Sequence, residues 1–565
     1  MSNSTIELLV SLRSLLDGAA FQSDKGALAL DILETAKQHS NQLGLVIFGL
    51  LTARCIYPVF KRSTAFRQLD GPKPESVLWG GEPLLFRVET SLTAREELLN
   101  TYGSVCKIKG MLGEDRLWVA DPRALNEIVQ KAYDSFHEAE IFLAWHRLAL
   151  GNYLTTHHGK STLPASIVNL AQFSTQYLPP IICVNTPTFT AIAHQLEDII
   201  ASKAQANGGT FGTVDIHTWL SKVSLEMIGQ AGMGYSFGAM DGKQHPYLKA
   251  SNQLFPGCAA PPAPAHNALF WFLRPFLPTL VKFGPAGFRR AVVDCLPVEK
   301  VQELKNITDT MDTTAVHIYQ KKKVALANGT LESEIAAGQD VISMLLKQNE
   351  VVPPEEQMTE EEIIAHVNAL VNAGNDTTSS ALEQIFYLLA QHPDVQDRLH
   401  EEIREAHRLY GRDLDYDQLN SLTLLDAVCR ESLRLLPPAH MVERVACVDY
   451  NLPLHHPVKS KDGKTIISNL HVPKGTHIYL SLFSANRDKQ TWGEDADKFN
   501  PYRWLEPMVT SVSESKMPGV YSNIMTFVGG PRACLGFKFS LAEIKVVLSL
   551  LLRFAKWFAK RALGF

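Results

Sequence analysis

The sequence predicts a mainly α chain with small β-sheets, an α+β fold class, and two patterns support this expectation. Long stretches repeat apolar residues at helical spacing, notably residues 215–234, 361–391 and 537–552. Residues 94–133 instead read as helix, strand, strand and helix, and the apolar side chains of residues 105–120 alternate as in a small sheet. Helices therefore dominate, and at least one sheet forms early in the chain.

An apolar stretch near the N-terminus, residues 43–60, predicts a single transmembrane anchor. Its length is just enough to span a bilayer, although Arg54 within it is costly there. Basic residues follow at once, so the positive-inside rule places residues 1–42 in the lumen as a tail and the rest of the chain in the cytosol. An interfacial or core helix is the alternative. Residues 61–75 then form a proline-rich hinge.

The composition of the whole chain excludes several classes of function. A net charge of −5 over 565 residues is too mild to indicate nucleic-acid binding. The 8 cysteines are scattered and include no Cys-x-x-Cys pair, which argues against a disulfide framework and against a zinc site. The bulk of the chain therefore suits a reducing compartment.

Residues 527–536 place one cysteine, Cys534, in a loop flanked by glycines. Gly530 and Gly536 allow positive φ and close backbone approach, as a turn around a flat cofactor requires. The apolar run that follows reads as a helix, so the sulfur lies at its N-terminus, where the helix dipole and a metal favour the thiolate. Arg532 is placed to meet an anionic group at the cofactor edge. An inert cysteine before a core helix is the alternative.

The helix predicted at 361–391 contains Ala373-Gly374-Asn375-Asp376-Thr377-Thr378 at its centre. Glycine costs roughly 1 kcal/mol in a helix, and Ser/Thr hydroxyls bond back to earlier carbonyls. A helix accepts such residues where a ligand approaches its backbone, and a kinked core helix is the alternative. Glu431 and Arg434 share one face of a second helix, which by itself is typical of a weak surface pair.

In combination these segments resemble the cytochrome P450 family. Phe527-x-x-Gly530-x-Arg532-x-Cys534-x-Gly536 matches the family's haem-binding loop. The resemblance implies the P450 fold and bound haem b, iron protoporphyrin IX, with Cys534 as the axial ligand of the haem iron. Phe527, Gly530, Arg532 and Gly536 are then cofactor-binding residues.

The same resemblance assigns further roles. The central segment of the 361–391 helix is similar to the family's oxygen-binding groove, so Ala373 and Gly374 lie at the cofactor, Thr377 hydrogen-bonds dioxygen or its water, and Asp376 takes part in proton delivery. Glu431 and Arg434 match the family's Glu-x-x-Arg signature, closed by a downstream arginine, here Arg503, in a buried structural network.

Two more positions follow from the resemblance. Arg444 corresponds to the arginine that meets a haem propionate, and His440 and Met441 line the substrate cavity. The chain also departs from the family. Residues 160–185 lack arginine where members carry a basic helix that contacts a propionate, and the C-terminus is short after the last helix. Residues 76–565 are nevertheless expected to form the P450 haem domain.

The implied activity is that of a haem-thiolate monooxygenase of fungal microsomal type. It inserts one atom of O2 into an apolar small molecule, in secondary metabolism or xenobiotic oxidation. Electrons come from an NADPH-cytochrome P450 reductase, with cytochrome b5 as an additional partner. The implied location is the endoplasmic reticulum membrane, single-pass, with the haem domain cytosolic. A P450-fold peroxide isomerase or dehydratase, or a catalytically impaired P450 relic, is the alternative.

Overall fold

The computed structural model describes residues 66–76, 80–87, 90–110, 113–156, 178–206, 213–242, 245–254, 276–333 and 335–557. The predicted tail, the anchor at 43–60 and the start of the hinge lie outside these residues, as does most of the unusual segment at 160–185. Among the described residues, no helix combines the length and the apolar character that crossing a bilayer requires. Residues 63–110 and 115–565 form one compact unit, which carries the strands and helices of the fold.

A five-stranded sheet joins distant parts of the chain in the order β1-β2-β7-β4-β3. Its strands are β1 (Val105–Lys109), β2 (Asp115–Val119), β3 (Phe136–His137), β4 (Met441–Ala446) and β7 (His477–Ser481). Only the β2–β7 pair is parallel, and the neighbouring pairs are antiparallel. Buried Val119, Phe136 and Leu480 belong to the core beneath it. The strands predicted at 105–110 and 116–122 are thus present as β1 and β2.

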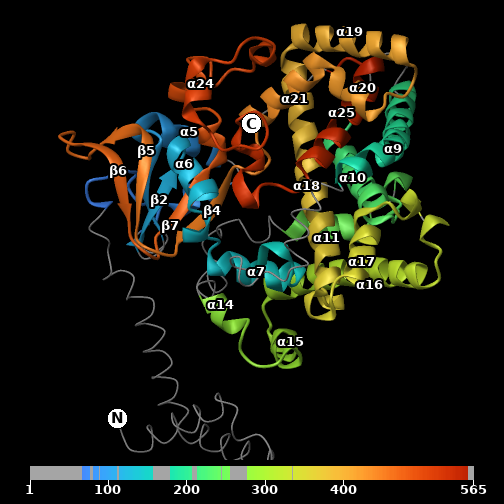
Figure 1. Cartoon of the computed structure of the whole chain (residues 1–565), viewed down its shortest axis with the longest axis horizontal. Helices are drawn as coiled ribbons and strands as arrows, with labels where there is room; N and C mark the ends of the chain where they lie inside the picture. The colour runs from blue at the N-terminus through green and yellow to red at the C-terminus, as the bar shows by residue number, and fades with distance from the viewer. Residues whose placement is uncertain are drawn as a thin grey trace, which may run out of the picture. The chain divides into compact units, whose positions relative to one another are not determined.

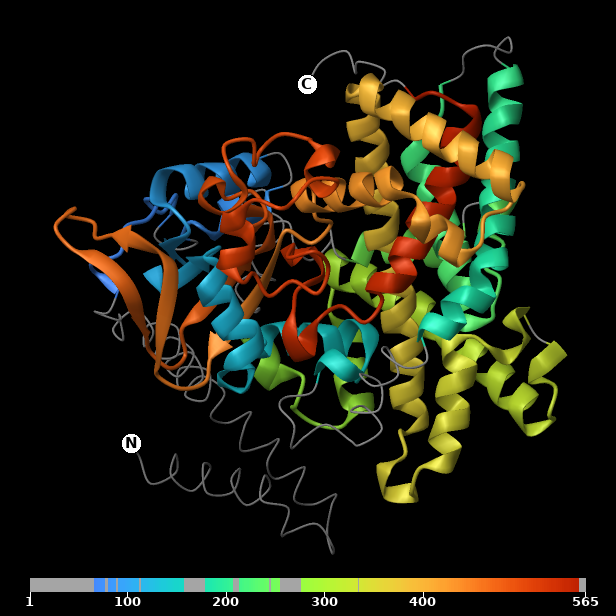
Figure 2. The ribbon, with the colours of Figure 1, turned by 45° about the horizontal axis from the view of Figure 1, so that its top comes forward.

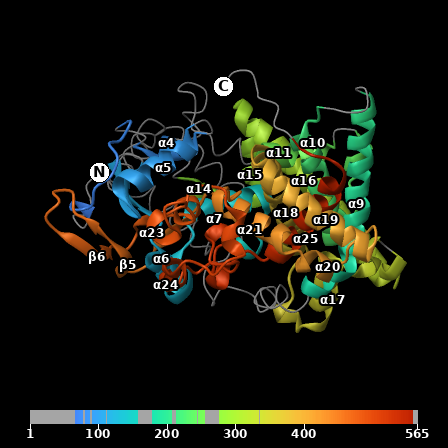
Figure 3. The ribbon, with the colours of Figure 1, turned by 90° about the horizontal axis from the view of Figure 1, so that it is seen from above.

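A separate two-stranded sheet is formed by β5 (Tyr450–Lys459) and β6 (Ile466–Val472). The two strands pair antiparallel, with an irregularity in register between Pro453 and Val458. Figures 1 and 3 place this hairpin at the end of the unit opposite α9 (Leu178–Ala206). Small sheets accompanying a helical majority agree with the predicted fold class.

Helices make up most of the remaining structure. The larger ones after α9 are α10 (Ile216–Met227), α11 (Pro246–Leu254), α15 (Ala286–Cys295), α16 (Glu299–Ala327), α17 (Val341–Val351), α18 (Glu360–Gln391), α19 (Pro393–Tyr410), α21 (Thr423–Leu435) and α25 (Phe537–Phe554). The remaining α-helices are α4 (Glu82–Phe86), α5 (Ser91–Tyr102), α6 (Pro122–Asn126), α7 (Glu140–Leu150), α14 (Leu277–Leu280), α20 (Tyr416–Ser421), α22 (Leu482–Ala485), α23 (Lys489–Trp492) and α24 (Thr510–Ser515).

The long helices α9, α18, α19 and α25 lie together on the side away from the sheet strands (Figure 1). Their apolar faces meet in one large core, to which Phe189, Ile385 and Leu548 contribute from three different helices. Figure 2 shows the red segment that precedes α25 running between the sheet and these helices. The loop predicted to bind the cofactor therefore lies at the junction of the two parts.

Local sequence explains where α18 starts. The Thr359 side chain accepts a hydrogen bond from the Glu362 N–H, and the Glu362 side chain accepts one from the Thr359 N–H, which completes a capping box. Acidic residues 360–362 also favour the positive end of the helix dipole. The helix that follows spans the residues in which the oxygen-binding segment was predicted.

The departure at 160–185 ends inside regular structure. Residues 178–185 form the beginning of α9, and the helix continues through Pro187 to Ala206. Ile181, Ile182 and Phe189 from this stretch are buried in the helical core. The arginine-free end of the unusual segment thus contributes to the core.

Candidate functional site: the cysteine loop and its surroundings

The loop that carries Cys534 is fixed by one backbone contact and one glycine. The Cys534 N–H donates to the Phe527 carbonyl oxygen at 2.9 Å and so closes the loop. Gly530 has φ +69°, and a Cβ there would lie 2.0 Å from the Val129 carbonyl oxygen in the π-helical turn η3 (Glu127–Lys131). Only glycine fits this position, because both the backbone angle and the space exclude a side chain.

Cys534 is accessible to solvent, yet much of its surroundings is protein. The side chain is exposed, yet desolvation by the surrounding protein raises the pKa of its thiol, an effect that a backbone hydrogen bond at Gly536 opposes. A Cβ added to Gly536 would meet no atom within 4 Å, so open space adjoins this residue. Coordination to a metal would deprotonate the thiol despite the raised pKa.

Phe527, another fixed position of the loop, packs between two aromatic rings. The half-buried ring of Phe527 packs edge-on against Tyr521 and at a tilt against Phe537, with 5.9 Å between ring centroids in each case. Phe537 is the first residue of α25, so Cys534 precedes that helix closely. The sequence prediction of a cysteine near a helix N-terminus therefore agrees with the structure.

The centre of α18 is open where the sequence places the oxygen-binding segment. Ala373, Asp376 and Thr377 are exposed, although their neighbours on the same helix are largely buried. The Thr377 hydroxyl donates to the Ala373 carbonyl oxygen at 2.8 Å. Gly374 faces a protein neighbour instead, since a Cβ there would lie 3.0 Å from the Ile228 side chain. The structure therefore places Asp376 and Thr377 on an accessible helix face and packs Gly374 against a neighbouring turn.

Asp376 lies in an environment that favours its protonated form. Desolvation raises the pKa of the carboxyl group, and the nearby His217 partly opposes this shift. His217 comes from α10 and contacts Glu383, with 2.9 Å between Nδ1 and Oε2. A carboxyl group with a raised pKa beside an accessible hydroxyl is suited to holding and releasing a proton.

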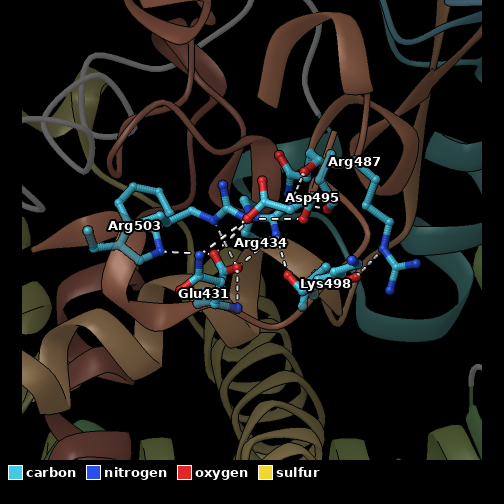
Figure 4. Close-up of polar contacts among 11 residues, drawn as sticks. Glu431, Arg434, Arg487, Asp495, Lys498 and Arg503 are labelled. Carbon is cyan, nitrogen blue, oxygen red and sulfur yellow. Dashed lines mark hydrogen bonds and ion pairs between the residues drawn. The ribbon is translucent and has the colours of Figure 1, made fainter. Parts of the chain in front are cut away.

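Glu431, Arg434 and Arg503 meet in a buried network (Figure 4). Arg434 donates to both carboxylate oxygens of Glu431 at 2.9 Å. Arg503 Nε donates to Glu431 Oε1 at 3.0 Å, and Trp504 Nε1 donates to Oε2 at 3.0 Å. Desolvation favours a raised pKa for Glu431, but the hydrogen bonds and charges of the two arginines lower it. The carboxylate is therefore charged and fully engaged.

The same network fixes a loop-rich segment after the sheet. Arg434 Nη1 donates to the carbonyl oxygens of Asn486 and Ala496 at 2.7 and 2.6 Å, and Nη2 donates to that of Lys498 at 3.2 Å. Arg503 also pairs with Asp495 at 2.8 Å. Asn486 in turn accepts from the Met525 N–H at 2.7 Å, two residues before Phe527. The network is thus connected to the start of the cysteine loop.

Arg444 and Arg532, the two predicted propionate partners, converge on one carboxylate. Arg532 Nη1 lies 2.9 Å from Glu138 Oε2, and Arg444 Nη2 lies 3.5 Å from Glu138 Oε1. Arg444 belongs to β4 and Arg532 to the short turn η14 (Gly530–Arg532). Desolvation lowers the pKa of Arg444, and Arg532 lowers it further, whereas Glu138 opposes both effects.

His440 and Met441 lie where β4 begins, opposite the end of β7. The His440 ring meets Phe483 edge-on at 5.8 Å between centroids. Desolvation, together with the charges of Arg95 and Arg487, lowers the pKa of His440 to about 4. The imidazole is therefore neutral at physiological pH. Neither of the two residues predicted to line the substrate cavity, His440 and Met441, then carries a charge.

Sequence reasoning missed two acidic residues. Glu138 follows a two-residue strand and belongs to no motif, so only the pairing of β3 with β4 reveals its position. Glu543 is fully buried in α25, and burial raises its pKa well above the ordinary range, with the Thr378 hydroxyl as a polar neighbour that opposes the shift. Glu543 could have been found from the sequence, because it is an acidic residue within the apolar stretch 537–552.

The side chains around Cys534 suit a cofactor in which most of the metal ligands belong to the cofactor itself. Within the described ranges, no group of three or more His, Cys, Asp or Glu side chains could hold a bare metal ion. A single accessible cysteine can, however, supply the one axial bond that a porphyrin iron requires. Arg444 and Arg532 provide positive charge for the porphyrin carboxylates. The residues therefore fit haem.

Comparison with known proteins decides the family. The family model described as Cytochrome P450 matches residues 72–560. The chain belongs to the cytochrome P450 family. Cytochrome P450 monooxygenase 212 of Postia placenta is 38% identical over 86% of this chain and 87% of its own length. The ganoderic acid synthetase of Ganoderma lucidum is 35% identical over 90% of this chain and 91% of its own.

Membership establishes the class of enzyme and its cofactor. The chain is a P450 monooxygenase with haem b as its cofactor, as the sequence predicted. A further relative, the P450 monooxygenase eriI of Hericium erinaceus, is 35% identical over 85% of this chain and 86% of its own length. The helical fold with small sheets is that expected of a P450.

Proposed function

We propose that this P450 oxidises an apolar small molecule, using electrons from an NADPH-dependent reductase, with cytochrome b5 as a second donor. One observation carries the proposal: α18 is open at Asp376 and Thr377, and burial gives Asp376 a raised pKa. An intact acid and hydroxyl on an accessible helix face favour oxygen activation over peroxide isomerisation, which needs no delivered protons. Haem held by a cysteine thiolate supplies O–O bond cleavage when it is bound.

The chain's own residues divide the remaining work. Cys534 would hold the haem iron through its thiolate, while Arg444 and Arg532 would hold the haem carboxylates. Asp376 holds a proton that it passes toward Thr377. The Thr377 hydroxyl donates to the Ala373 carbonyl and keeps its lone pairs free to accept a further hydrogen bond.

The proposed substrate class rests on the wall formed by His440 and Met441. Because burial and two nearby arginines keep His440 neutral, no charge is presented by these two side chains. His440 also packs against the apolar ring of Phe483. Burying an apolar molecule against such a wall is favourable, whereas a charged substrate would lose its hydration there without compensation.

The reduced, carbon-monoxide-treated absorption spectrum of the purified enzyme tests haem ligation. We expect a thiolate-type Soret band that Cys534→Ala abolishes, whereas Cys447→Ala keeps it. Absence of that band from the wild type would favour an impaired relic. Consumption of NADPH with a reductase and a panel of apolar compounds then tests turnover. Conversion of peroxides without a reductase would instead favour the isomerase alternative.

We also propose a single-pass anchor at residues 43–60 in the endoplasmic reticulum membrane, with the haem domain cytosolic. The apolar run and the basic residues after it support this orientation. Carbonate extraction of the full chain and of a variant that lacks residues 1–60 tests it. The full chain should stay with the membrane and expose the haem domain to added protease on the cytosolic side. Extraction of the full chain into the supernatant would contradict the anchor.

A further inference from the structure

We infer that the carboxylate of Glu138 repels the haem propionates that Arg444 and Arg532 hold, and thereby weakens the retention of haem. The inference rests on the proposed roles of these two arginines as propionate partners. It adds a third residue that no motif marks and that acts in the opposite direction. Its consequence is measurable as the rate at which haem leaves the protein.

The fold places Glu138 between the two arginines. The register of β3 and β4 pairs His137 with Val445, so the chain after His137 continues beside Arg444. Arg532 reaches the same carboxylate from the cysteine loop. Each guanidinium lies next to a different oxygen of Glu138, at 3.5 Å for Arg444 and 2.9 Å for Arg532.

Burial makes this cluster sensitive to charge. The side chains of Glu138 and Arg444 are 7% and 10% exposed. Two guanidinium groups in such surroundings repel each other, and one carboxylate compensates half of their charge. Glu138 therefore supplies the counter-charge that keeps both arginines in place before a porphyrin carboxylate arrives.

The arrival of a propionate changes that balance. A guanidinium has five N–H donors, so the arginines can bind a propionate without first releasing Glu138. Two carboxylates then share the same pair of cations in a poorly hydrated site and repel each other. Among the residues that the structure describes, Glu138 Oε2 receives no well-directed hydrogen bond despite its proximity to Arg532. The contact between Arg532 and Glu138 is therefore mainly electrostatic.

The charge of Glu138 stabilises the haem-free state and destabilises the haem-bound state, so both effects weaken haem binding. Removing the charge of Glu138 takes a counterion from the haem-free state and a repulsive neighbour from the haem-bound state. The equilibrium accordingly moves toward bound haem. Glu138→Gln makes this change with almost no loss of volume, and Glu138→Asp draws the carboxylate back from both arginines while keeping its charge.

The test measures transfer of haem from the enzyme to excess apomyoglobin. We expect haem to leave Glu138→Gln roughly fivefold more slowly than wild type, with Glu138→Asp between them. Glu140→Gln removes an exposed carboxylate two positions away and should match wild type. Haem dimethyl ester, whose side chains carry no charge, should leave wild type and Glu138→Gln at equal rates.

The outcomes separate the two levels of the proposal. Equal or faster loss of haem from Glu138→Gln overturns the role of Glu138, and if that variant does not fold, equal or faster loss from Glu138→Asp does so. If haem and its dimethyl ester leave the wild type at the same rate, the proposed roles of Arg444 and Arg532 fail, whatever the variants show.

Discussion

Replacing Glu431 by glutamine should destabilise the haem domain severely. Glutamine keeps the size of the side chain but retains one oxygen and places an NH2 group where the second oxygen accepts. If the NH2 group replaces Oε2, the hydrogen bonds from Arg434 Nε and Trp504 Nε1 are lost. Two buried guanidiniums also lose their shared negative charge. Removing one partner of a buried ion pair costs about 3–5 kcal/mol, a large part of a typical stability of about 5–15 kcal/mol.

Urea unfolding of the holoenzyme, followed by Soret absorbance and far-UV circular dichroism, measures this loss. Glu405→Gln is the matched control, because Glu405 and Arg408 have the same spacing on a helix but their side chains are 54% and 68% exposed. The control should leave the unfolding midpoint unchanged, since exposed pairs contribute little. A midpoint for Glu431→Gln equal to that of the control would refute a stabilising role for the buried network.

Three further predictions concern other parts of the site. His440→Gln should make the free energy of unfolding less sensitive to acid. In the wild type the pKa of His440 is about 4 in the folded state, so the unfolded chain takes up a proton at a higher pH than the folded one. Between pH 7.5 and pH 5 the free energy of unfolding from urea titrations should therefore fall by about 2 kcal/mol more in the wild type than in the variant. Thr377→Val, which keeps the shape of the side chain, should lower product formed per NADPH by roughly 10²-fold while the haem spectrum is unchanged, and unaltered coupling would contradict the role of the hydroxyl. Gly530→Ala should prevent stable folding or haem uptake because its Cβ would overlap the Val129 carbonyl, whereas Gly536→Ala should keep wild-type circular dichroism, having no atom within 4 Å of the added Cβ.

Patterns that are local in sequence were the predictable part of this fold. The spacing around Cys534, the mid-helix segment at Asp376 and Thr377, and the two strands expected at 105–110 and 116–122 could all be read directly, because each depends on residues close together in the chain. Arg503 was placed with Glu431 only through resemblance to a family, since 72 residues separate them.

Contacts set by strand pairing and burial could not be read in this way. Glu138 meets Arg444 because two strands from opposite ends of the chain share a register, and nothing in the sequence near either residue specifies it. The neutral state of His440 depends on Arg95 and Arg487, which come from other segments. The arginine-free stretch at 160–185 gave no indication that its end would join the core through Ile181 and Ile182.

The close fit of Gly530 against the Val129 carbonyl has a consequence for protein engineering. Gly530 and Val129 are about four hundred positions apart in the chain. The Val129 carbonyl nevertheless occupies the space that a side chain at position 530 would need. A chimaera that imports the cysteine loop from a relative must therefore import the turn at Glu127–Lys131 as well. Recombination libraries that exchange both segments together should yield more pigmented clones than libraries that exchange either one alone.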